Sequence, residues 1–186
     1  MDKRDSTLEL NIRRKIYTHI KKHPGLHERE LSRQLKIPLS TLDYHLHYLS
    51  KRNLIAKNIE GKQSCYYIVG RVGTVEKKLL SILRQKMSRR IIIFLILNNF
   101  SNNKDICNHL GLASNTVSFH LNKLVKLDFI DRSKMGREMI YSIKNPEYIS
   151  DLLVVYQKSF LDDAVDRFVD TWSGLNPKQI SKKDDK

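Results

Sequence analysis

The sequence repeats itself without a gap at an offset of 75 positions. In this alignment residues 14–68 fall on residues 89–143, and 12 of the 55 pairs are identical. The identities include positions that a folded unit would bury, such as Leu46 with Leu121. A fixed period of this kind indicates two copies of one domain. The chain is therefore expected to fold as two small domains of the same structure.

Within each copy the hydrophobic period changes in the same order. Three amphipathic segments come first, and the third has apolar residues at 42, 46 and 49, or at 117, 121 and 124, as a helix with one buried face requires. Alternating segments around Gly61 and Gly136 follow, a pattern typical of a β-hairpin. Three helices and a hairpin predict a winged helix. The expected fold class is mainly α with small β-hairpin wings: two tandem winged-helix domains joined by a helix, plus a C-terminal helix.

The same patterns predict where the parts of the chain begin and end. We expect a first winged-helix domain over 7–70, a linker helix over 71–87, a second winged-helix domain over 88–146, a C-terminal helix over 147–172 and a disordered tail over 173–186. The linker is expected to be helical because Val75, Leu79 and Ile82 form an apolar stripe among lysines and arginines.

Positive charge is concentrated in the two copies. Residues 1–70 carry 14 basic and 7 acidic side chains, residues 71–146 carry 14 and 5, and residues 147–186 carry 6 and 8, giving +7, +9 and −2. A scattered surplus of lysine would only keep a small protein dissolved. Because the charge is segregated into two basic blocks, we expect a polyanionic partner such as nucleic acid.

Two strings carry a family resemblance. HPGLHERELSRQLKIPLSTLDYHLHYLSKRNLI and NHLGLASNTVSFHLNKLVKLDFI resemble the helix-turn-helix core of winged-helix transcriptional regulators of the ArsR and MarR-like type, in the tandem form of archaeal members. The resemblance covers residues 13–69 and 88–144. It implies a sequence-specific transcriptional regulator whose partner is the double-stranded DNA of a promoter or operator. The Cys-rich metal-sensing motif of many ArsR members is missing, so metal regulation is not carried over.

The third helix of each copy supplies the residues expected to enter a DNA groove. With the apolar stripe facing the core, helical geometry leaves the other positions on the open side. These DNA-binding candidates are Ser40, Thr41, Asp43, Tyr44, His45 and His47 in the first copy, and Ser114, Asn115, Thr116, Ser118, Phe119, His120 and Asn122 in the second. Hydroxyls and amides pair with base edges or phosphates, and aromatic rings contact thymine methyl groups. The alternative for the aromatic and histidine side chains is packing between helices.

Four further cations are candidates for DNA contact. Lys62 and Arg137 lie beside the hairpin glycines, where a long cation enters a minor groove or simply stays solvated. Arg14 and Arg89 open the first helix of their copies, and we expect them to contact phosphates. The alternative is that both are only solvated residues at a helix start.

A second subunit is also expected. Ile93, Ile96 and Leu97 stand where the first copy has Thr18, Lys21 and Lys22, so the first helix of the second copy is apolar nearly all round and needs a cover. Residues 147–172 carry apolar side chains at helical spacing that can supply it. We expect a homodimer through these surfaces, and an intramolecular brace is the alternative.

Several classes are excluded by what the sequence lacks. There is no glycine-rich phosphate loop, nucleophile elbow or His-Glu-x-x-His pair, so we expect no catalytic residues, no enzyme and no cofactor. Cys65 and Cys107 have no metal-ligand spacing, and no metal site is expected. The longest apolar run, from Ile91 to Leu97, is far shorter than the roughly 20 residues that span a membrane.

The charged N-terminus does not resemble a signal peptide, which predicts a cytoplasmic protein without membrane contact. Two alternatives to a regulator remain: a protein-interaction scaffold built from winged helices, and a sequence-neutral chromatin or RNA-binding protein.

Overall fold

The computed structural model describes residues 3–60 and 63–175, with side-chain surroundings for residues 9–59 and 64–174. The chain folds into two compact units, Met1–Arg84 and Gln85–Lys186. The first contains α1 (Lys3–Lys22), β1 (Leu26–His27), α2 (Glu28–Leu35), α3 (Leu39–Lys51), β2 (Ile55–Glu60), β3 (Gln63–Ile68) and α4 (Thr74–Arg84). The second contains α5 (Lys86–Asn98), β4 (Phe100–Asn102), α6 (Asn103–Leu110), α7 (Ser114–Lys126), β5 (Ile130–Met135), β6 (Glu138–Ile143), α8 (Pro146–Val155), α9 (Gln157–Phe160) and α10 (Asp163–Leu175).

The repeat in the sequence is a repeat in the backbone. A shift of 75 positions maps α2 onto α6, α3 onto α7, β2 onto β5 and β3 onto β6, with the same bounds. Hydrogen bonds recur at the same places: the amide of Leu54 donates to the Leu49 carbonyl at 3.1 Å, and that of Phe129 to the Leu124 carbonyl at 3.1 Å. The prediction of two tandem winged helices is confirmed.

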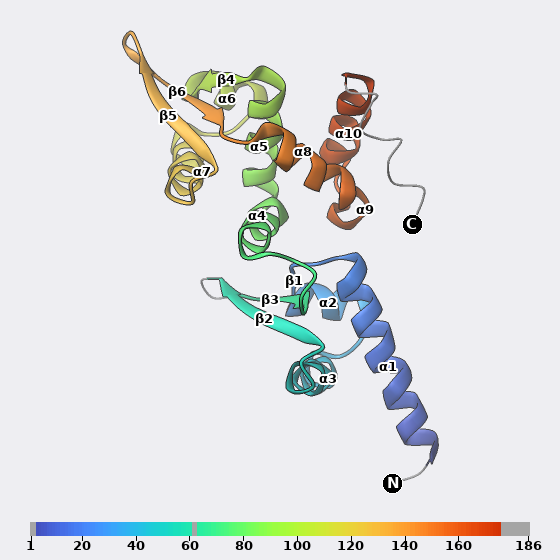
Figure 1. Ribbon diagram of the computed structural model, residues 1–186. Coiled ribbons are helices and arrows are strands. Elements are labelled where there is room, and N and C mark those ends of the chain that lie inside the picture. The colour runs from blue at the N-terminus through green and yellow to red at the C-terminus, as the bar shows by residue number, and fades with distance from the viewer. Residues whose placement is uncertain (1–2, 61–62, 176–186) are drawn as a thin grey trace. The chain divides into compact units, whose positions relative to one another are not determined.

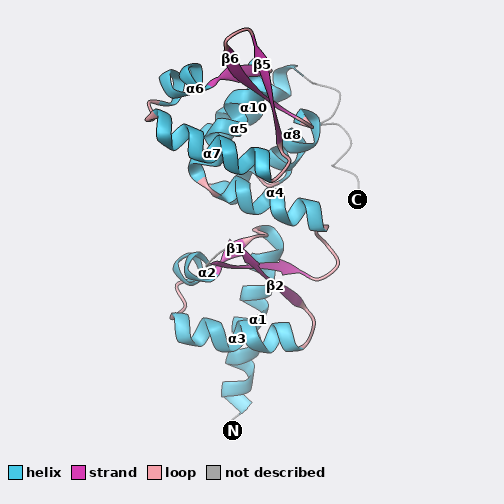
Figure 2. Ribbon diagram, turned by 90° about the vertical axis from the view of Figure 1, so that its left-hand side faces the viewer, coloured by secondary structure: helices cyan, strands magenta, loops and turns pink. Residues whose placement is uncertain are grey.

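Each unit pairs its helices with one small antiparallel sheet (Figure 2). The strand order is β1-β3-β2 in the first unit and β4-β6-β5 in the second. Ile55 pairs with Ile68 and Ile130 with Ile143, so the two hairpins have the same register. The second hairpin turns at Gly136, whose φ of +62° is costly for residues with a Cβ, and β5 is exposed from Asp131 onward.

The third helix of each copy buries the predicted stripe. Leu42, Leu46 and Leu49 are at most 3% exposed, and their counterparts Val117, Leu121 and Leu124 are completely buried. In the first unit they pack with Ile16 and Ile20 of α1, Leu31 and Leu35 of α2, and the hairpin residues Ile55, Tyr66 and Ile68. Each such side chain contributes about 1.5–3 kcal/mol by leaving water. This stripe fixes which face of α3 and α7 stays open.

The helix predicted between the copies belongs to the first unit. α4 occupies part of the expected range 71–87, and its backbone carbonyl at Lys77 accepts a hydrogen bond from the Tyr67 hydroxyl at 3.1 Å. At its other end, the Arg84 guanidinium donates to the Pro24 carbonyl at 2.9 Å. These bonds attach α4 to the loop and sheet of the first winged helix.

The single helix predicted over 147–172 is wrong. The structure has α8, α9 and α10, with breaks at Tyr156 and at Leu161, whose φ of +50° lies in the left-handed region. After this reversal Asp162 begins a new helix, because its carboxylate accepts a hydrogen bond from the Ala164 amide at 3.1 Å. The tail predicted over 173–186 is helical at 173–175, and residues 176–186 lie outside the described residues.

The reversal brings α10 beside α5 within the second unit (Figure 1). Ile93 and Ile96 of α5 are only 7% and 6% exposed, whereas Leu97 is 44% exposed. The intramolecular brace therefore covers the face that Ile93 and Ile96 were expected to offer to a second subunit, and that part of the dimer prediction is wrong. Among the described residues no helix combines the length and hydropathy needed to cross a bilayer.

Candidate nucleic-acid interface

The turn before each third helix is built on a residue in the left-handed conformation. In the second copy this is Gly111, with φ +64°, and in the first copy it is Lys36, with φ +55°. Glycine adopts this conformation without strain, and a lysine tolerates it only because its neighbours hold it there. The Ser32 hydroxyl contributes, because it donates to the Ile37 carbonyl at 2.7 Å across the turn.

In the second copy one asparagine ties the helix pair together. The Asn103 side chain, at the start of α6, donates to the Ser118 hydroxyl at 2.9 Å and accepts from the Ser114 hydroxyl at 3.0 Å. Both serines lie on α7, so these bonds set the position of α7 against α6. Ser114 is exposed, but the half-buried Ser118 is occupied by this contact.

Most of the predicted groove residues are on the open face of their helix. In α3 the exposed ones are Ser40, Asp43, Tyr44 and His47, with Thr41 half-buried, and in α7 they are Ser114, Asn115, Thr116, Phe119 and Asn122. Tyr44 and Phe119 are 55% and 66% exposed, so the alternative that these rings pack between helices is wrong. The open face of α7 thus presents two amides, hydroxyls and one aromatic ring.

Two of the three histidines on these helices, His45 and His120, do not face outward as predicted. His45 is 2% exposed, and burial, with a smaller effect from Arg13, lowers its pKa. His120 is half-buried, its Nδ1 lies 2.9 Å from the Ser88 hydroxyl, and burial again lowers its pKa, followed by the charge of Lys123. Both rings stay neutral near pH 7 and serve packing, which was the alternative interpretation.

The two arginines expected at phosphates have different surroundings. Arg14 is exposed on α1. Arg89 is 5% exposed and ion-paired with Asp162, its Nε donating to the carboxylate at 3.0 Å, so the prediction of a phosphate contact at Arg89 is wrong. Burial alone would raise the pKa of Asp162, but the hydrogen bonds from Arg89 and the Ala164 amide, together with the positive charges of Arg89 and Lys86, outweigh it and the pKa is lowered. Arg89 therefore anchors the start of α10 to α5.

The second wing is strongly basic. Arg137 is exposed beside Gly136 at the hairpin tip, and the sequence interpretation missed Arg132 and Lys134, two exposed cations on one face of β5. Their alternation with Asp131 and Ser133 was the available signal. In the first copy the same positions hold Lys57 and Ile59, the latter 69% exposed. Lys62, the predicted cation of the first wing, lies outside the described residues.

Each of the two winged helices matches a known protein family. Residues 10–80 match a family described as an N-terminal HTH domain, and residues 87–132 match the family described as bacterial regulatory protein, arsR family. The chain carries a tandem pair of winged helix-turn-helix domains.

A relative and two solved structures are similar to this tandem pair. A Methanocaldococcus jannaschii protein named as an uncharacterized HTH-type transcriptional regulator is 32% identical over 149 residues, which are 80% of this chain and 36% of that protein. The chain thus spans about a third of that relative's length. The transcriptional repressor PagR of Bacillus anthracis is 29% identical over 42% of this chain and 88% of its own, with a TM-score of 0.38. NadR in complex with 4-hydroxyphenylacetate is 18% identical over 54% and 72%, with a TM-score of 0.37.

Proposed function

We propose that the chain is a transcriptional regulator that binds double-stranded DNA in a sequence-specific manner, with α7 in a major groove. The observation that carries the proposal is the open face of α7, where Asn115, Thr116, Phe119 and Asn122 are exposed while the opposite stripe is completely buried. The name of the M. jannaschii relative supports the same function.

The side chains of this face are suited to reading bases. An asparagine amide can bind the N6 and N7 edge of adenine through two hydrogen bonds, and an aromatic ring can contact the methyl group of thymine. Each good base contact discriminates by about 1–3 kcal/mol. Asn115 and Phe119 are one helical turn apart, so they would meet neighbouring base pairs.

Cations of the second unit supply the attraction to phosphates. In our proposal Arg132, Lys134 and Arg137 of the wing contact the backbone or the adjacent minor groove. Arg14 holds a phosphate beside the first winged helix, where α3 reads a second groove through Ser40, Thr41, Tyr44 and His47. Binding that depends on such contacts weakens steeply as salt rises.

We further propose that both winged helices, spanning residues 7–70 and 88–146, engage one duplex. If they enter the same face of the DNA, their half-sites lie about 34 Å apart or at a multiple of it. Promoter DNA as the partner implies action in the cytoplasm. Hydroxyl-radical footprinting tests the arrangement: two protected patches support it, and one short patch contradicts it.

The experiment that tests the function is selection of bound duplexes from a random pool, followed by a salt titration with the selected duplex. A regulator enriches one sequence and loses affinity steeply as salt rises. A protein-interaction scaffold binds no duplex. A sequence-neutral chromatin or RNA binder shows the salt dependence without enrichment.

A homodimer remains part of the proposal, on the outer side of residues 147–172. Tyr148 and Val155, two turns apart on α8, are 43% and 47% exposed, and Leu161 is 76% exposed. A self-complementary contact through these side chains would give a two-fold dimer. Light scattering of the wild type against Val155→Ser combined with Leu161→Ser tests it, because the double variant should be monomeric. A monomeric wild type at high micromolar concentration contradicts it.

A further inference from the structure

An open groove crosses the first unit between α1 and the end of α3. Its volume is about 600 Å³, and pockets that hold a whole ligand measure roughly 300–1,000 Å³. Much of its lining is apolar, with Leu10, Tyr17 and Leu54 among the side chains. Leu10 and Leu54 are 61% and 45% exposed. The first unit therefore presents an apolar hollow that is large enough for side chains of another molecule.

Three arginines surround this hollow. The Cζ atom of Arg13 lies 3.8 Å from the centroid of the Tyr48 ring, and that of Arg52 lies 5.5 Å from the same centroid. Arg14 lines the groove one residue further along α1 and is exposed. Glu9 pairs with Arg13, but among the side chains that the structure describes no carboxylate lies within ion-pair distance of Arg14 or Arg52. The apolar hollow thus has an uncompensated positive rim.

The repeat shows that the same surface is covered in the second copy. Seventy-five positions on, Arg89, Ile92 and Phe129 take the places of Arg14, Tyr17 and Leu54, and they are only 5%, 0% and 9% exposed. The backbone of the two copies is the same, so the difference in burial comes from what lies on top. The first copy therefore has the surface without its cover.

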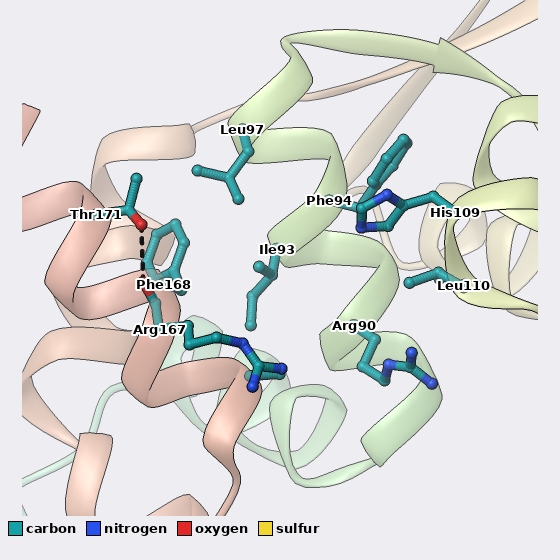
Figure 3. Close-up of a pocket in the computed structure, with 10 residues that line it drawn as sticks. Arg90, Ile93, Phe94, Leu97, His109, Leu110, Arg167, Phe168 and Thr171 are labelled. Carbon is teal, nitrogen blue, oxygen red and sulfur yellow. Dashed lines mark hydrogen bonds between the residues drawn. The ribbon is translucent and has the colours of Figure 1, made fainter.

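Part of the cover in the second unit is its C-terminal segment. The Asp162 carboxylate accepts a hydrogen bond from Arg89 at 3.0 Å, and the Phe160 ring has its centroid 5.3 Å from the Arg89 Cζ. Further along the segment, Phe168 of α10 and Ile93 of α5 point toward each other (Figure 3). An aromatic side chain and, two residues later, a carboxylate thus close this surface around its arginine.

The first unit has no such segment of its own in the groove. The chain that follows its hairpin continues into α4, which is bonded to Tyr67 and Pro24 and contributes no residue to the groove lining. The C-terminal segment is not available either, because Phe160 is 8% exposed and Asp162 is paired within the second unit. A cover for the groove has to come from another molecule.

We propose that the groove on the first unit binds an acidic segment of a partner protein, with an aromatic side chain over Tyr17 and Leu54 and a carboxylate on Arg14. In such a segment the aromatic residue precedes an Asp or Glu by two positions, as Phe160 precedes Asp162. Arginine and carboxylate form strong charge-assisted hydrogen bonds, and arginine and tyrosine are enriched among the residues that dominate binding energy. The charge of +7 on residues 1–70 attracts an acidic partner.

The partner and DNA would compete for Arg14. In the proposed function this arginine holds a phosphate, and a guanidinium that is engaged by a carboxylate cannot make the same contact. A bound segment therefore weakens DNA binding by the first winged helix. This step rests on the proposed function, whereas binding of the segment does not.

The first experiment measures binding of a peptide without DNA. The probe is a synthetic peptide with the sequence of residues 157–172, which carries Phe160 and Asp162 at their natural spacing, and the full chain is titrated by calorimetry and NMR. The chain's own segment is tethered beside the second unit, so its high effective concentration keeps that site filled. We expect saturable binding with shifts of the Tyr17 and Leu54 amides. A peptide with Asp162→Asn should bind about tenfold more weakly.

Three outcomes of this titration overturn the proposal. The first is absence of saturable binding, and the second is a set of shifts confined to the second unit. The third is equal binding of a scrambled peptide of the same composition, because the attraction would then depend on net charge alone.

Variants then locate the site. Arg14→Met and Leu54→Ser should each weaken binding of the peptide about tenfold. Lys21→Met removes an exposed cation of α1 outside the groove and is the control, which should bind like the wild type. Unchanged binding in both groove variants overturns the proposal. Because the comparison of the peptides uses the wild type, it stands even where a variant fails to fold.

A second copy of the chain is the competing occupant of the groove. Light scattering of the wild type and of Leu10→Ser separates the two cases. The same molar mass for both supports a separate partner. A wild-type dimer that Leu10→Ser dissociates would make the groove a contact between copies and overturn the proposal.

The last experiment adds the selected duplex. The peptide should weaken the DNA affinity of the wild type several-fold, and the peptide with Asp162→Asn should have a smaller effect at the same concentration. A peptide that binds without changing the DNA affinity overturns the competition at Arg14. A chain that binds the peptide and no duplex refutes the proposed function and leaves the docking groove standing.

Discussion

The two winged helices have the same backbone and the same buried stripe, yet they expose different chemistry. Along its third helix the second copy has Asn115, the half-buried Ser118 and Phe119 where the first has Ser40, Asp43 and Tyr44. Its wing has two cations at the positions of Lys57 and Ile59. An acidic residue and an exposed isoleucine are poor contacts for DNA. The two copies thus share a core and differ at their surfaces, and under the proposed function we expect the second copy to make the stronger DNA contacts.

The first helices differ in the same way. Arg14 is exposed in the first copy, whereas its counterpart Arg89 is buried against Asp162 and ties down a C-terminal brace that the first copy lacks. Beside them, Arg13 lies over the Tyr48 ring at 3.8 Å, and the equivalent Ser88 bonds His120. Equivalent positions, such as Arg14 and Arg89, are therefore exposed in one copy and buried in the other.

The largest difference between the copies is expected at this arginine. Arg89→Met should lower the free energy of unfolding of the second unit by about 3–5 kcal/mol, because it leaves the Asp162 carboxylate buried without its partner. Arg14→Met, the matched change at an exposed site, should cost less than about 0.5 kcal/mol. Urea denaturation followed by the amide NMR signals of each unit measures both. Equal losses of unfolding free energy in the two variants would contradict the assignment of Arg89 to a buried ion pair and of Arg14 to the surface.

Acid should destabilise the first unit more than the second. Burial, with the nearby His19 as the next cause, lowers the pKa of His23 to about 4, and the second copy has Asn98 at the equivalent position. The unfolded chain takes up a proton near the unperturbed pKa of 6.5 and the folded one does not, so stability is lost as the pH falls from 6.5 to 4.

After allowance for partial exposure the loss is on the order of 2 kcal/mol. Denaturation at pH 7 and pH 4.5 measures it for each unit. His23→Asn, which introduces the residue of the second copy, should make the free energy of unfolding of the first unit depend less on pH. The same slope in this variant would show that a group other than His23 is responsible for the dependence.

For DNA affinity, substitutions in the second copy should have larger effects than the matched substitutions in the first. Asn115→Ala and Phe119→Ala should each weaken binding to the selected duplex by about 1–2 kcal/mol, or roughly five- to thirtyfold. The matched changes Ser40→Ala and Tyr44→Ala should have less than half that effect. Fluorescence anisotropy with a labelled duplex measures all four. Larger losses in the first copy would assign the main contact to α3 instead.

The smallest expected effect is on the salt dependence. Arg132→Gln and Lys134→Gln should each reduce the slope of log affinity against log salt by about 1, without changing which sequence is preferred. Lys57→Gln removes the cation of the first wing at the strand position equivalent to Arg132 and should reduce the slope by less. A preference for a different sequence in either β5 variant would mean that the wing reads bases.

Sequence patterns predicted the parts of this molecule that depend on local periodicity. The stripe at Leu42 and Leu46, the hairpin around Gly136 and the repeat itself follow from spacing of three, four or two residues. Exposure of Tyr44 and Phe119 also follows from helical geometry once the stripe is known.

What the sequence did not predict depends on long-range contacts or on unfavourable backbone. Arg89 and Asp162 are 73 residues apart, so no pattern near either one indicates the pair. The chain reversal at Leu161 uses a left-handed residue that is neither glycine nor asparagine, and helical spacing continues across it. His45 is one position from the buried Leu46 at the edge of the core, where periodicity alone does not decide burial.

The most direct test of the account is a photo-cross-linking measurement on the full chain with the selected duplex. A photoreactive phenylalanine analogue is introduced at Phe119, on the open face of α7, and in a separate control at Leu161, which is more exposed but lies in the C-terminal segment. We predict cross-links to bases from position 119 and none from position 161. Cross-links from position 161 with none from position 119 would contradict the assignment of α7 as the reading helix.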